Sequence, residues 1–105
     1  MSERADVTVT DDPDNHRYVA TVDGQKAGVA VYHLAQGRHL FVHTEVDEAF
    51  EGRGVGGQLV RGALDDVRAK GGSVVPLCPF VKRWIGDHDE YHSLVDEELE
   101  TLLRP

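Results

Sequence analysis

The stretch that decides the fold is Val46-Asp47-Glu48-Ala49-Phe50-Glu51-Gly52-Arg53-Gly54-Val55-Gly56-Gly57-Gln58, which holds four glycines within residues 52–57. Residues 39–46 before it have the alternating pattern of a β-strand, and residues 55–70 after it have the pattern of a helix. A glycine-rich turn that opens a helix exposes backbone N–H groups at the positive end of the helix dipole. The sequence therefore predicts an anion site here, and phosphate is the usual anion at such a turn.

Strand signals dominate the chain before the glycines. Residues 7–10, 17–22 and 26–34 alternate in the manner of strands, and Asp23-Gly24 is a strong hairpin signal. In residues 39–46, simple alternation places Leu40, Val42, Thr44 and Val46 on one face and Phe41, His43 and Glu45 on the other. The first half is therefore predicted to be an antiparallel meander of about four strands.

The chain after the glycines has the pattern helix, strand, helix. Val55, Leu59, Ala63 and Val67 form one apolar stripe, and Gly71-Gly72 ends that helix. Residues 73–77 are an apolar run, predicted as a buried strand parallel to residues 39–46 through a right-handed crossover. Pro79 suits the first position of a second helix, which places Cys78 at its N-cap. Residues 97–103 are predicted to form a short terminal helix.

Length and composition predict one domain, residues 1–105, with 40% hydrophobic and 29% charged residues. We expect neither a membrane span nor a secretory signal, because long apolar runs are absent from the sequence. A single cysteine, Cys78, excludes an internal disulfide and favours a cytoplasmic location. The net charge of −8 makes nucleic acid and anionic membranes poor partners.

Three phosphate ligands compete for the glycine stretch. A P-loop requires Lys and then Ser or Thr after its last glycine, but Gln58-Leu59 follows here. Gly52, Gly54 and Gly57 have dinucleotide spacing, yet that fold needs the glycines directly after the strand and an acidic residue ~20 positions later. Residues 47–51 intervene here, and the next strand ends without an acid. The remaining alternative is coenzyme A.

The coenzyme A interpretation comes from a resemblance. Val46-Asp47-x-x-Phe50-x-Gly52-Arg53-Gly54-Val55-Gly56 closely resembles the acetyl-CoA loop of the GNAT superfamily of N-acetyltransferases, in which Arg/Gln-x-x-Gly-x-Gly/Ala opens a helix after an aliphatic strand. The element order over residues 27–85 matches too, and residues 75–80 look like those of very small, stand-alone members. The resemblance implies an α/β fold with a mixed, largely antiparallel sheet and helices on its faces.

The sequence departs from the family pattern in three places. Glu51 occupies the usual Arg/Gln position, which puts a carboxylate near the expected pyrophosphate, with Arg53 as the compensating charge. The family's two helices between its first and second strands are missing, because only residues 11–16 lie there. Where the family often has a tyrosine as general acid, this chain has Trp84 and Ile85, and Tyr91 is the nearest tyrosine.

The resemblance implies acetyl transfer from acetyl-CoA to an amine. The pyrophosphate is expected on the amides of residues 53–58, and pantetheine between the strands that end at Val46 and Cys78. The residues implied to contact the cofactor are Thr44, Glu45, Val46, Arg53, Gly54, Val55, Gly56, Gly57, Gln58 and Cys78. The acceptor is an unidentified amine, and the missing helices imply an open site for an exposed amine such as a peptide end or a lysine.

Two other functions remain open. One is a module that binds coenzyme A or acyl-CoA without significant turnover, which the missing helices and missing tyrosine favour. The other is a protein-interaction domain that keeps the glycine stretch only as a structural turn. An assay of acetyl-CoA binding separates the protein-interaction domain, which would not bind it, from the enzyme and the binding module, which would.

Acetyl transfer needs a neutral amine, an oxyanion site and a route for the proton. Glu45 and His43 share one strand face about 7 Å apart, so either is a candidate proton relay, against the alternative of a solvated face. The helix dipole at the Cys78 N-cap, together with Lys82 and Arg83, favours a thiolate. Cys78 is therefore a candidate to accept an acetyl group or to contact the thioester, against the alternative of a small buried hydrophobe.

Histidine spacing gives no metal prediction. On a strand, His39 and His43 lie ~13 Å apart, too far to share one ion. His88 and His92 suit one ion only on a helix, and their intervening residues do not form the zinc-protease motif. Phe80 and Trp84, four residues apart, are predicted to be core residues rather than a platform for the cofactor.

Overall fold

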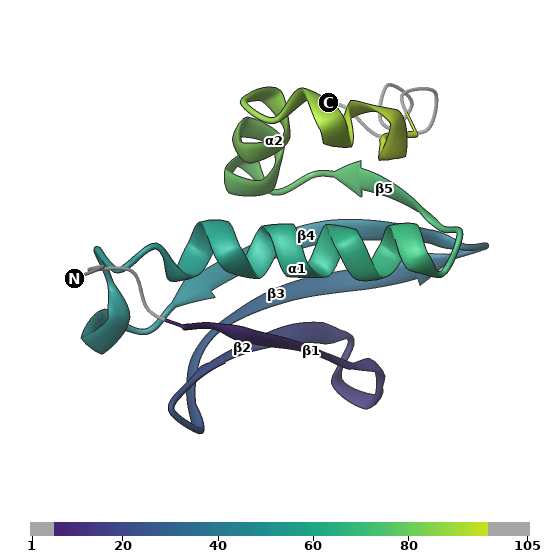
Figure 1. Cartoon of the computed structure of the whole chain (residues 1–105). Helices are drawn as coiled ribbons and strands as arrows, with labels where there is room; N and C mark the ends of the chain where they lie inside the picture. Colours follow the sequence, from purple (N-terminus) through teal and green to yellow (C-terminus); the bar gives the residue numbers. More distant parts are fainter. Residues whose placement is uncertain (1–5, 97–105) are drawn as a thin grey trace.

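The computed structural model describes residues 6–96, which form a five-stranded sheet with helices packed on it (Figure 1). The strands lie in chain order, antiparallel except for the parallel pair β4–β5. Their bounds are β1 Thr8–Asp12, β2 Arg17–Val22, β3 Gln25–Ala35, β4 Arg38–Val46 and β5 Ser73–Pro76. The helices are α1 Val55–Ala69 and α2 Pro79–Gly86, with 3₁₀ turns η1 Pro13–Asn15, η2 Glu48–Phe50 and η3 Asp89–Leu94.

The predicted fold class is confirmed. The meander, the crossover helix and the parallel last strand all form, and only the turn η1 joins β1 to β2. The predicted terminal helix at residues 97–103 lies outside the described residues. In the described part of the chain, no helix is both long and apolar enough to span a membrane.

The core lies between α1 and the sheet, with α2 and η3 packed beside α1 (Figure 1). The predicted stripe of α1 is fully buried, and neighbouring side chains of the same helix widen it. The residues that α1 buries are Val55, Leu59, Val60, Ala63, Leu64 and Val67. Burial of this face, rather than helix propensity, supplies most of the stability of a helix that has two glycines in its first turn.

A β-bulge in β4 overturns the predicted faces of that strand. Val31 pairs with His43 but Tyr32 pairs with Phe41, so Val42 is the extra residue. A bulge shifts the two-residue alternation, so the faces of residues 38–41 are reversed relative to those of residues 43–46. Phe41 therefore lies in the core, 1% exposed, and the prediction that Leu40 shares a face with Thr44 and Val46 is wrong.

Candidate functional site

The parallel pair β4–β5 is short, and this leaves part of β4 paired with β3 on one side but without a strand neighbour on the other. Pairing joins residues 38–41 to residues 73–76, and the last backbone bond runs from the Cys78 N–H to the Phe41 carbonyl at 2.7 Å. From there the chain turns into α2. Within residues 6–96, the segment Val42–Val46 has no backbone hydrogen bond to β5 or α2. We call Val42–Val46 the open edge of β4.

The glycine stretch has the predicted turn geometry at the end of this edge. Gly52 and Gly54 have φ of 78° and 76°, in the left-handed region that glycine adopts without a steric penalty. Gly54 is the N-cap of α1 and offers no side chain to the first helical turn. The first intrahelical bond runs from the Gln58 N–H to the Gly54 carbonyl, so the amides of Val55–Gly57 precede it and face outward from the helix end.

Gly56 and Gly57 are needed for a different reason, namely the approach of α2. A Cβ on Gly56 would lie 2.9 Å from Phe80 Cζ, and one on Gly57 would lie 3.4 Å from Trp84 Nε1. Trp84 packs on the core as predicted, but Phe80 is 43% exposed, so the prediction of a core residue is wrong for Phe80. Because Gly56 has no side chain, the Phe80 ring lies directly on the first turn of α1.

Charged side chains flank the turn without filling it. The Arg53 guanidinium lies 5.4 Å from the centroid of the Phe50 ring, which holds this cation beside the glycines. Asp47 caps η2, its carboxylate accepting the Ala49 N–H at 3.0 Å. Glu51, in the position that resembles the family's Arg or Gln, is exposed. One cation and one anion therefore stand next to the expected phosphate position.

Cys78 and Thr44 meet where β4 and β5 separate. Cys78 is the N-cap of α2 and 5% exposed, and its Sγ lies 3.5 Å from Thr44 Oγ1. The thiol therefore faces the open edge of β4 instead of the core alone, although it also packs in the main hydrophobic cluster. The structure thus brings together two residues that are 34 positions apart in the sequence and that were both predicted to contact the cofactor.

Glu45 and His43 share a face of β4, as alternation predicts, and this face is opposite to that of Thr44. His43 Nε2 and Glu45 Oε1 are 3.7 Å apart, and both side chains are more than half exposed. Glu45 also lines a cavity of about 250 Å³ at the end of the sheet. The other residues that line it are Lys26, Ala27, Gly28, Val29, Val46 and Asp47.

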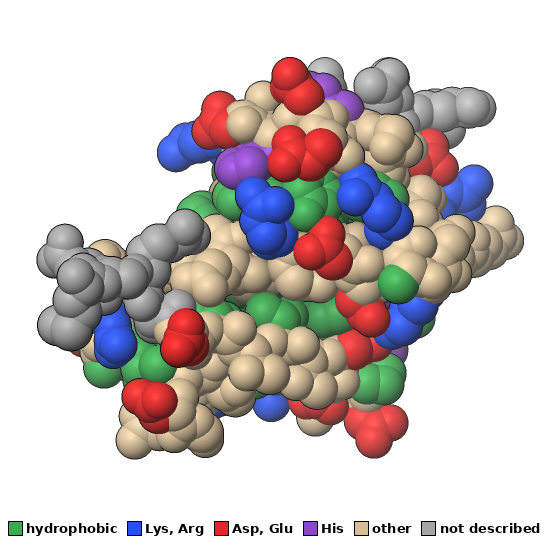
Figure 2. Space-filling view, in the orientation of Figure 1, with side chains coloured by type: hydrophobic (Ala, Val, Ile, Leu, Met, Phe, Trp, Pro, Cys, Tyr) green, Lys and Arg blue, Asp and Glu red, His purple; other side chains and the backbone are tan. Residues whose placement is uncertain are grey.

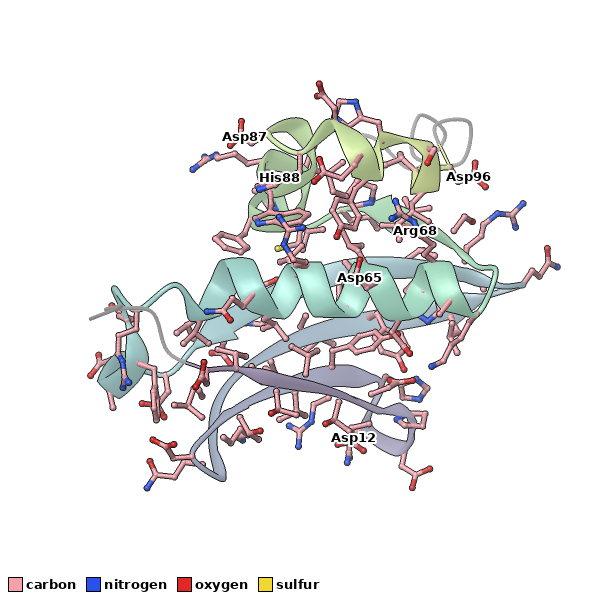
Figure 3. The ribbon with its side chains drawn as sticks, viewed as in Figure 1. Asp12, Asp65, Arg68, Asp87, His88 and Asp96 are labelled. Atoms are coloured by element: carbon pink, nitrogen blue, oxygen red, sulfur yellow. The ribbon has the colours of Figure 1, made fainter. Side chains whose placement is uncertain are left out.

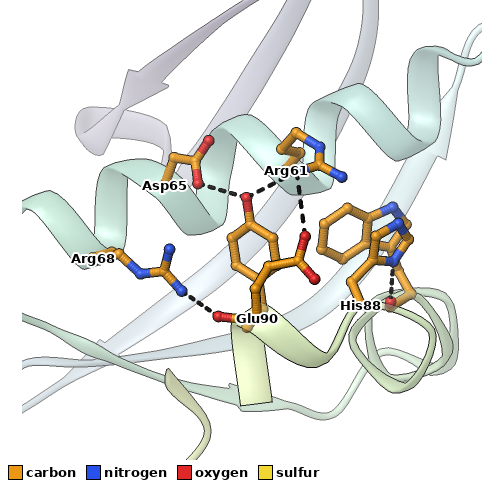
Figure 4. A network of polar contacts seen from close by, with 7 residues as sticks. Arg61, Asp65, Arg68, His88 and Glu90 are labelled. Atoms are coloured by element: carbon orange, nitrogen blue, oxygen red, sulfur yellow. Dashed lines mark hydrogen bonds and ion pairs between the residues drawn. The ribbon is translucent and has the colours of Figure 1, made fainter. Parts of the chain in front are cut away.

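Tyr91 is the tyrosine nearest in sequence to Trp84 and Ile85, where the family often has its general acid. Its hydroxyl is hydrogen-bonded within another part of the fold. Its hydroxyl donates to Asp65 at 2.7 Å and accepts from Arg61 at 3.2 Å, in a network between α1 and η3 (Figure 4). Burial and the bond to Asp65 raise the pKa of Tyr91. Basic and acidic side chains alternate over this side of the molecule, and Arg68 reaches from α1 towards η3 (Figures 2 and 3). This network fastens η3 to α1.

The carboxyl end of α1 carries a second polar network, around Asp66 and Lys70. Tyr18 donates to Asp66 at 2.7 Å and Tyr32 donates to Asp11 at 2.6 Å, while Lys70 bridges the two carboxylates at 2.7 and 2.9 Å. Burial raises the pKa of both tyrosines, and the carboxylates they bond to raise it further. Burial also opposes ionisation of Asp66, but the bonds from Lys70 and Tyr18 outweigh it and lower its pKa.

Three histidines, His39, His88 and His92, contact aromatic rings or backbone carbonyls of the fold. His39 is 6% exposed against the rings of Tyr18 and Tyr32, and its Nδ1 has no hydrogen-bond partner among residues 6–96. Its desolvation lowers its pKa. His88 and His92 each place a ring nitrogen on a backbone carbonyl of α2. Within residues 6–96, no group of three potential ligands is placed to hold a metal ion.

Residues 17–94 match the family described as GCN5-related N-acetyl-transferase. A comparison with curated protein sequences gives no match.

Solved structures of acetyltransferases resemble this one. A GCN5-like putative N-acetyltransferase from Staphylococcus aureus superposes with a TM-score of 0.62 at 18% identity, over 90% of each chain. A GNAT family acetyltransferase from Brucella melitensis, in complex with acetyl-CoA, gives 0.50 at 25% identity over 65% of this chain and 50% of its own. The ribosomal-protein-S18-alanine N-acetyltransferase of Escherichia coli gives 0.51 at 19% identity over 55% of this chain. The chain spans only 38% of that enzyme's length.

Proposed function

Since the chain belongs to the GCN5-related N-acetyltransferase family, we propose that it binds acetyl-CoA and transfers the acetyl group to an amine. The observation that carries this proposal is the continuity between the glycine turn and the open edge of β4. The two meet at one point, because a Cβ on Gly56 would lie 3.5 Å from the Val46 side chain. One elongated ligand can therefore place its phosphates at the first turn of α1 and its thioester at Cys78.

The phosphate end is supported by the first turn of α1. The amides of Val55–Gly57 lie at the positive end of the helix dipole and precede the first intrahelical bond. Arg53 adds a cation beside them, while Glu51 weakens the site by its negative charge. The similarity to the Brucella melitensis protein, whose structure holds acetyl-CoA, supports the same ligand for this chain.

The thioester end is supported by the open edge of β4 and by Cys78. The backbone groups of Thr44 and Val46 point to an edge that no strand of the described chain occupies, whereas those of Glu45 face Val29 of β3 in the antiparallel alternation. A carbonyl held there would gain from donors aimed at its developing negative charge during attack by the amine. As the tetrahedral intermediate collapses, the carbon–sulfur bond breaks, and coenzyme A leaves as a thiolate that takes up a proton.

Two routes for the acetyl group differ in the role of Cys78. In direct transfer, the amine attacks the thioester, Glu45 or His43 accepts the amine proton, and Cys78 only contacts the sulfur. In the two-step route, the Cys78 thiolate attacks first and releases coenzyme A, and the amine then attacks the acetyl-cysteine and restores the thiol. The 3.5 Å contact between Thr44 Oγ1 and Cys78 Sγ favours the second route weakly, because it orients the thiol.

The acceptor is an exposed amine, such as a peptide end or a lysine side chain. The turn η1 replaces the helices that would wall the site, so a large acceptor has access to it. Glu45 is exposed beside the cavity at the sheet end, and the net charge of −8 attracts cationic groups. The chemistry and the single cysteine suit a cytoplasmic protein, and that location is part of the proposal.

One observation favours the alternative of a binding module without significant turnover. Tyr91 is held by Asp65 and Arg61, so it does not stand ready to protonate a leaving thiolate at Cys78. A module of this kind would bind acetyl-CoA as tightly as an enzyme would, and only an assay of amine acetylation separates the two.

The test is made in two stages. Titration calorimetry with acetyl-CoA should show binding, and the absence of both heat and a thermal shift would leave only the protein-interaction alternative. A panel of peptides and amines incubated with acetyl-CoA is then analysed by mass spectrometry, with wild type and Glu45→Gln compared. We expect acetylation that slows in Glu45→Gln. Binding without acetylation of any amine would favour the binding module.

The same spectra test Cys78. An increase in protein mass by one acetyl group, lost in Cys78→Ala, is expected for the two-step route. An unchanged protein mass under conditions in which an amine is acetylated would favour direct transfer.

A further inference from the structure

We propose that Phe80 is the gate for the pantetheine arm of coenzyme A, and that its ring swings aside to let the arm reach the open edge of β4. The inference rests on the proposed function, because it assigns a role along the route between the phosphate end and the thioester end of the same site.

The contact of Phe80 with α1 lies on this route. A Cβ on Gly56 would touch the Phe80 ring at 2.9 and 3.4 Å and the Val46 side chain at 3.5 Å. The Phe80 ring, the first turn of α1 and the end of β4 therefore converge on one point. Val46 ends the open edge of β4 and Phe80 follows Cys78 by two residues, so we place this point on the way from the amides of Val55–Gly57 to the thiol. A ligand that joins the two must pass it.

The ring is able to move from this position. Phe80 is 43% exposed and stands in the first turn of α2, whereas the next buried residue of that turn, Val81, is 1% exposed and anchors the helix. Swinging the Phe80 side chain to another rotamer thus leaves the anchoring contact of α2 intact. A side chain that closes a route and is only partly buried reduces the rate of ligand entry by the fraction of time it stays closed.

Phe80 also accounts for the glycine at position 56. A methyl group there would collide with the far end of a flexible side chain, not with the backbone. Alanine at this position should displace the ring and hold the gate open. The requirement for Gly56 is therefore a closed gate, whereas the requirement for Gly54 is its left-handed backbone.

Stopped-flow fluorescence tests the gate in the full chain. The single tryptophan, Trp84, lies beside Gly57 and reports arrival of a ligand at the first turn of α1. We expect Phe80→Ala to bind coenzyme A with an association rate constant roughly fivefold higher than wild type. The matched control is Leu34→Ala, which truncates another exposed side chain, 53% exposed, on β3 and should leave the rate unchanged.

A second ligand separates the gate from a general loosening of the site. Adenosine 3′-phosphate 5′-diphosphate keeps the phosphates of coenzyme A but lacks the pantetheine arm. Its association rate should be the same for wild type and Phe80→Ala. Gly56→Ala should raise the rate for coenzyme A in a wild-type background and should add nothing to Phe80→Ala.

The outcomes are distinct. An equal or slower rate for coenzyme A in Phe80→Ala, with wild type binding normally, would overturn the gate and leave the proposed function intact. An equal acceleration of both ligands would also overturn it, because the effect would not depend on the arm. Wild type that binds neither ligand would overturn the proposed function and the gate with it.

Discussion

The two ends of α1 are held in opposite ways. At its amino end, Gly54 gives no side-chain cap, and Gly56 and Gly57 contribute no side chains. At its carboxyl end, Asp66 and Lys70 are tied into the network that includes two tyrosines from β2 and β3. We call these the open end and the tied end of α1.

The difference teaches where this small domain can accept a ligand. The N-cap residue Gly54 has no side chain to cap the first turn of α1, so backbone donors at the open end can serve a ligand. The tied end satisfies its polar groups within the chain and stabilises the packing of α1 on the sheet. Variants at the open end should therefore change cofactor binding, and variants at the tied end should change stability.

The largest expected effect follows from Gly54→Val. A β-branched residue resists a φ of 76°, so the first turn of α1 should reorganise and its amides should lose their alignment. Loss of two charge-assisted hydrogen bonds predicts a dissociation constant for acetyl-CoA about 100-fold weaker. The matched control is Gly24→Val in the β2–β3 turn, with φ of 79° and nothing within 4 Å.

Calorimetry and urea unfolding together decide this comparison. Both variants should lose about 1–3 kcal/mol of unfolding free energy from the same backbone strain, while only Gly54→Val weakens binding. If Gly24→Val weakened binding equally, the effect would belong to stability rather than to the turn.

Tyr18→Phe tests the tied end. Its hydroxyl is buried and donates to Asp66 at 2.7 Å, so its removal should cost about 1–2 kcal/mol of unfolding free energy. The dissociation constant for acetyl-CoA should stay within a factor of about two, as expected for a distant site.

Thr44→Val removes a hydroxyl at the open edge of β4 and should give the reverse profile. We expect weaker binding of acetyl-CoA, measured by calorimetry, with the unfolding free energy changed by less than about 0.5 kcal/mol.

Acid should lower the unfolding free energy through His39, which lies near the charged groups of the tied end. Its burial lowers its pKa below the ordinary value of 6.5, so the unfolded chain binds a proton more readily than the folded chain does. The unfolding free energy should therefore be highest above pH 6.5 and fall as the pH drops from 6.5 towards the folded pKa. The slope contributed by one proton is at most about 1.4 kcal/mol per pH unit.

Urea unfolding of wild type and His39→Phe between pH 7.5 and 5 measures this slope. The groups that face His39 are Asp11, Asp66 and Lys70, and the two carboxylates oppose the effect of burial. We expect His39→Phe to lose part of the pH dependence in this window. Identical slopes for both proteins would show that His39 has the same proton affinity in the folded and unfolded states.

The smallest effect is expected from Glu51→Gln at the open end. Removing one exposed anion beside the expected pyrophosphate should tighten acetyl-CoA binding by about twofold to fivefold, and added salt should shrink the difference. Glu48→Gln, a neighbouring carboxylate in η2, is the control and should have a smaller effect. Weaker binding in Glu51→Gln would show that this carboxylate supports the site.

The features predictable from the sequence are those with local signals. The left-handed turn is encoded by Gly52 and Gly54, the buried face of α1 by the spacing of its apolar residues, and the last strand by its uninterrupted apolar run. Each depends on residues that are near one another in the chain. The same holds for the pair of His43 and Glu45, which share a face through simple alternation.

The features that escaped prediction depend on contacts across the fold. The bulge at Val42 results from the register between β3 and β4, and the alternation in the sequence continues through it without a break. Burial of His39 against Tyr18 and Tyr32 follows from that bulge. The exposure of Phe80 depends on how α2 packs against the first turn of α1, and a four-residue aromatic spacing is equally typical of a core helix.

The central claim is that acetyl-CoA lies between the open end of α1 and the open edge of β4. Amide chemical shifts of the full chain, followed by NMR during a titration with acetyl-CoA, test it most directly. The account predicts shifts at Val55–Gly57 and Thr44–Val46, with Asp66 and Lys70 unchanged. Shifts centred on Asp66 and Lys70, or no shifts at a saturating concentration of acetyl-CoA, would contradict it.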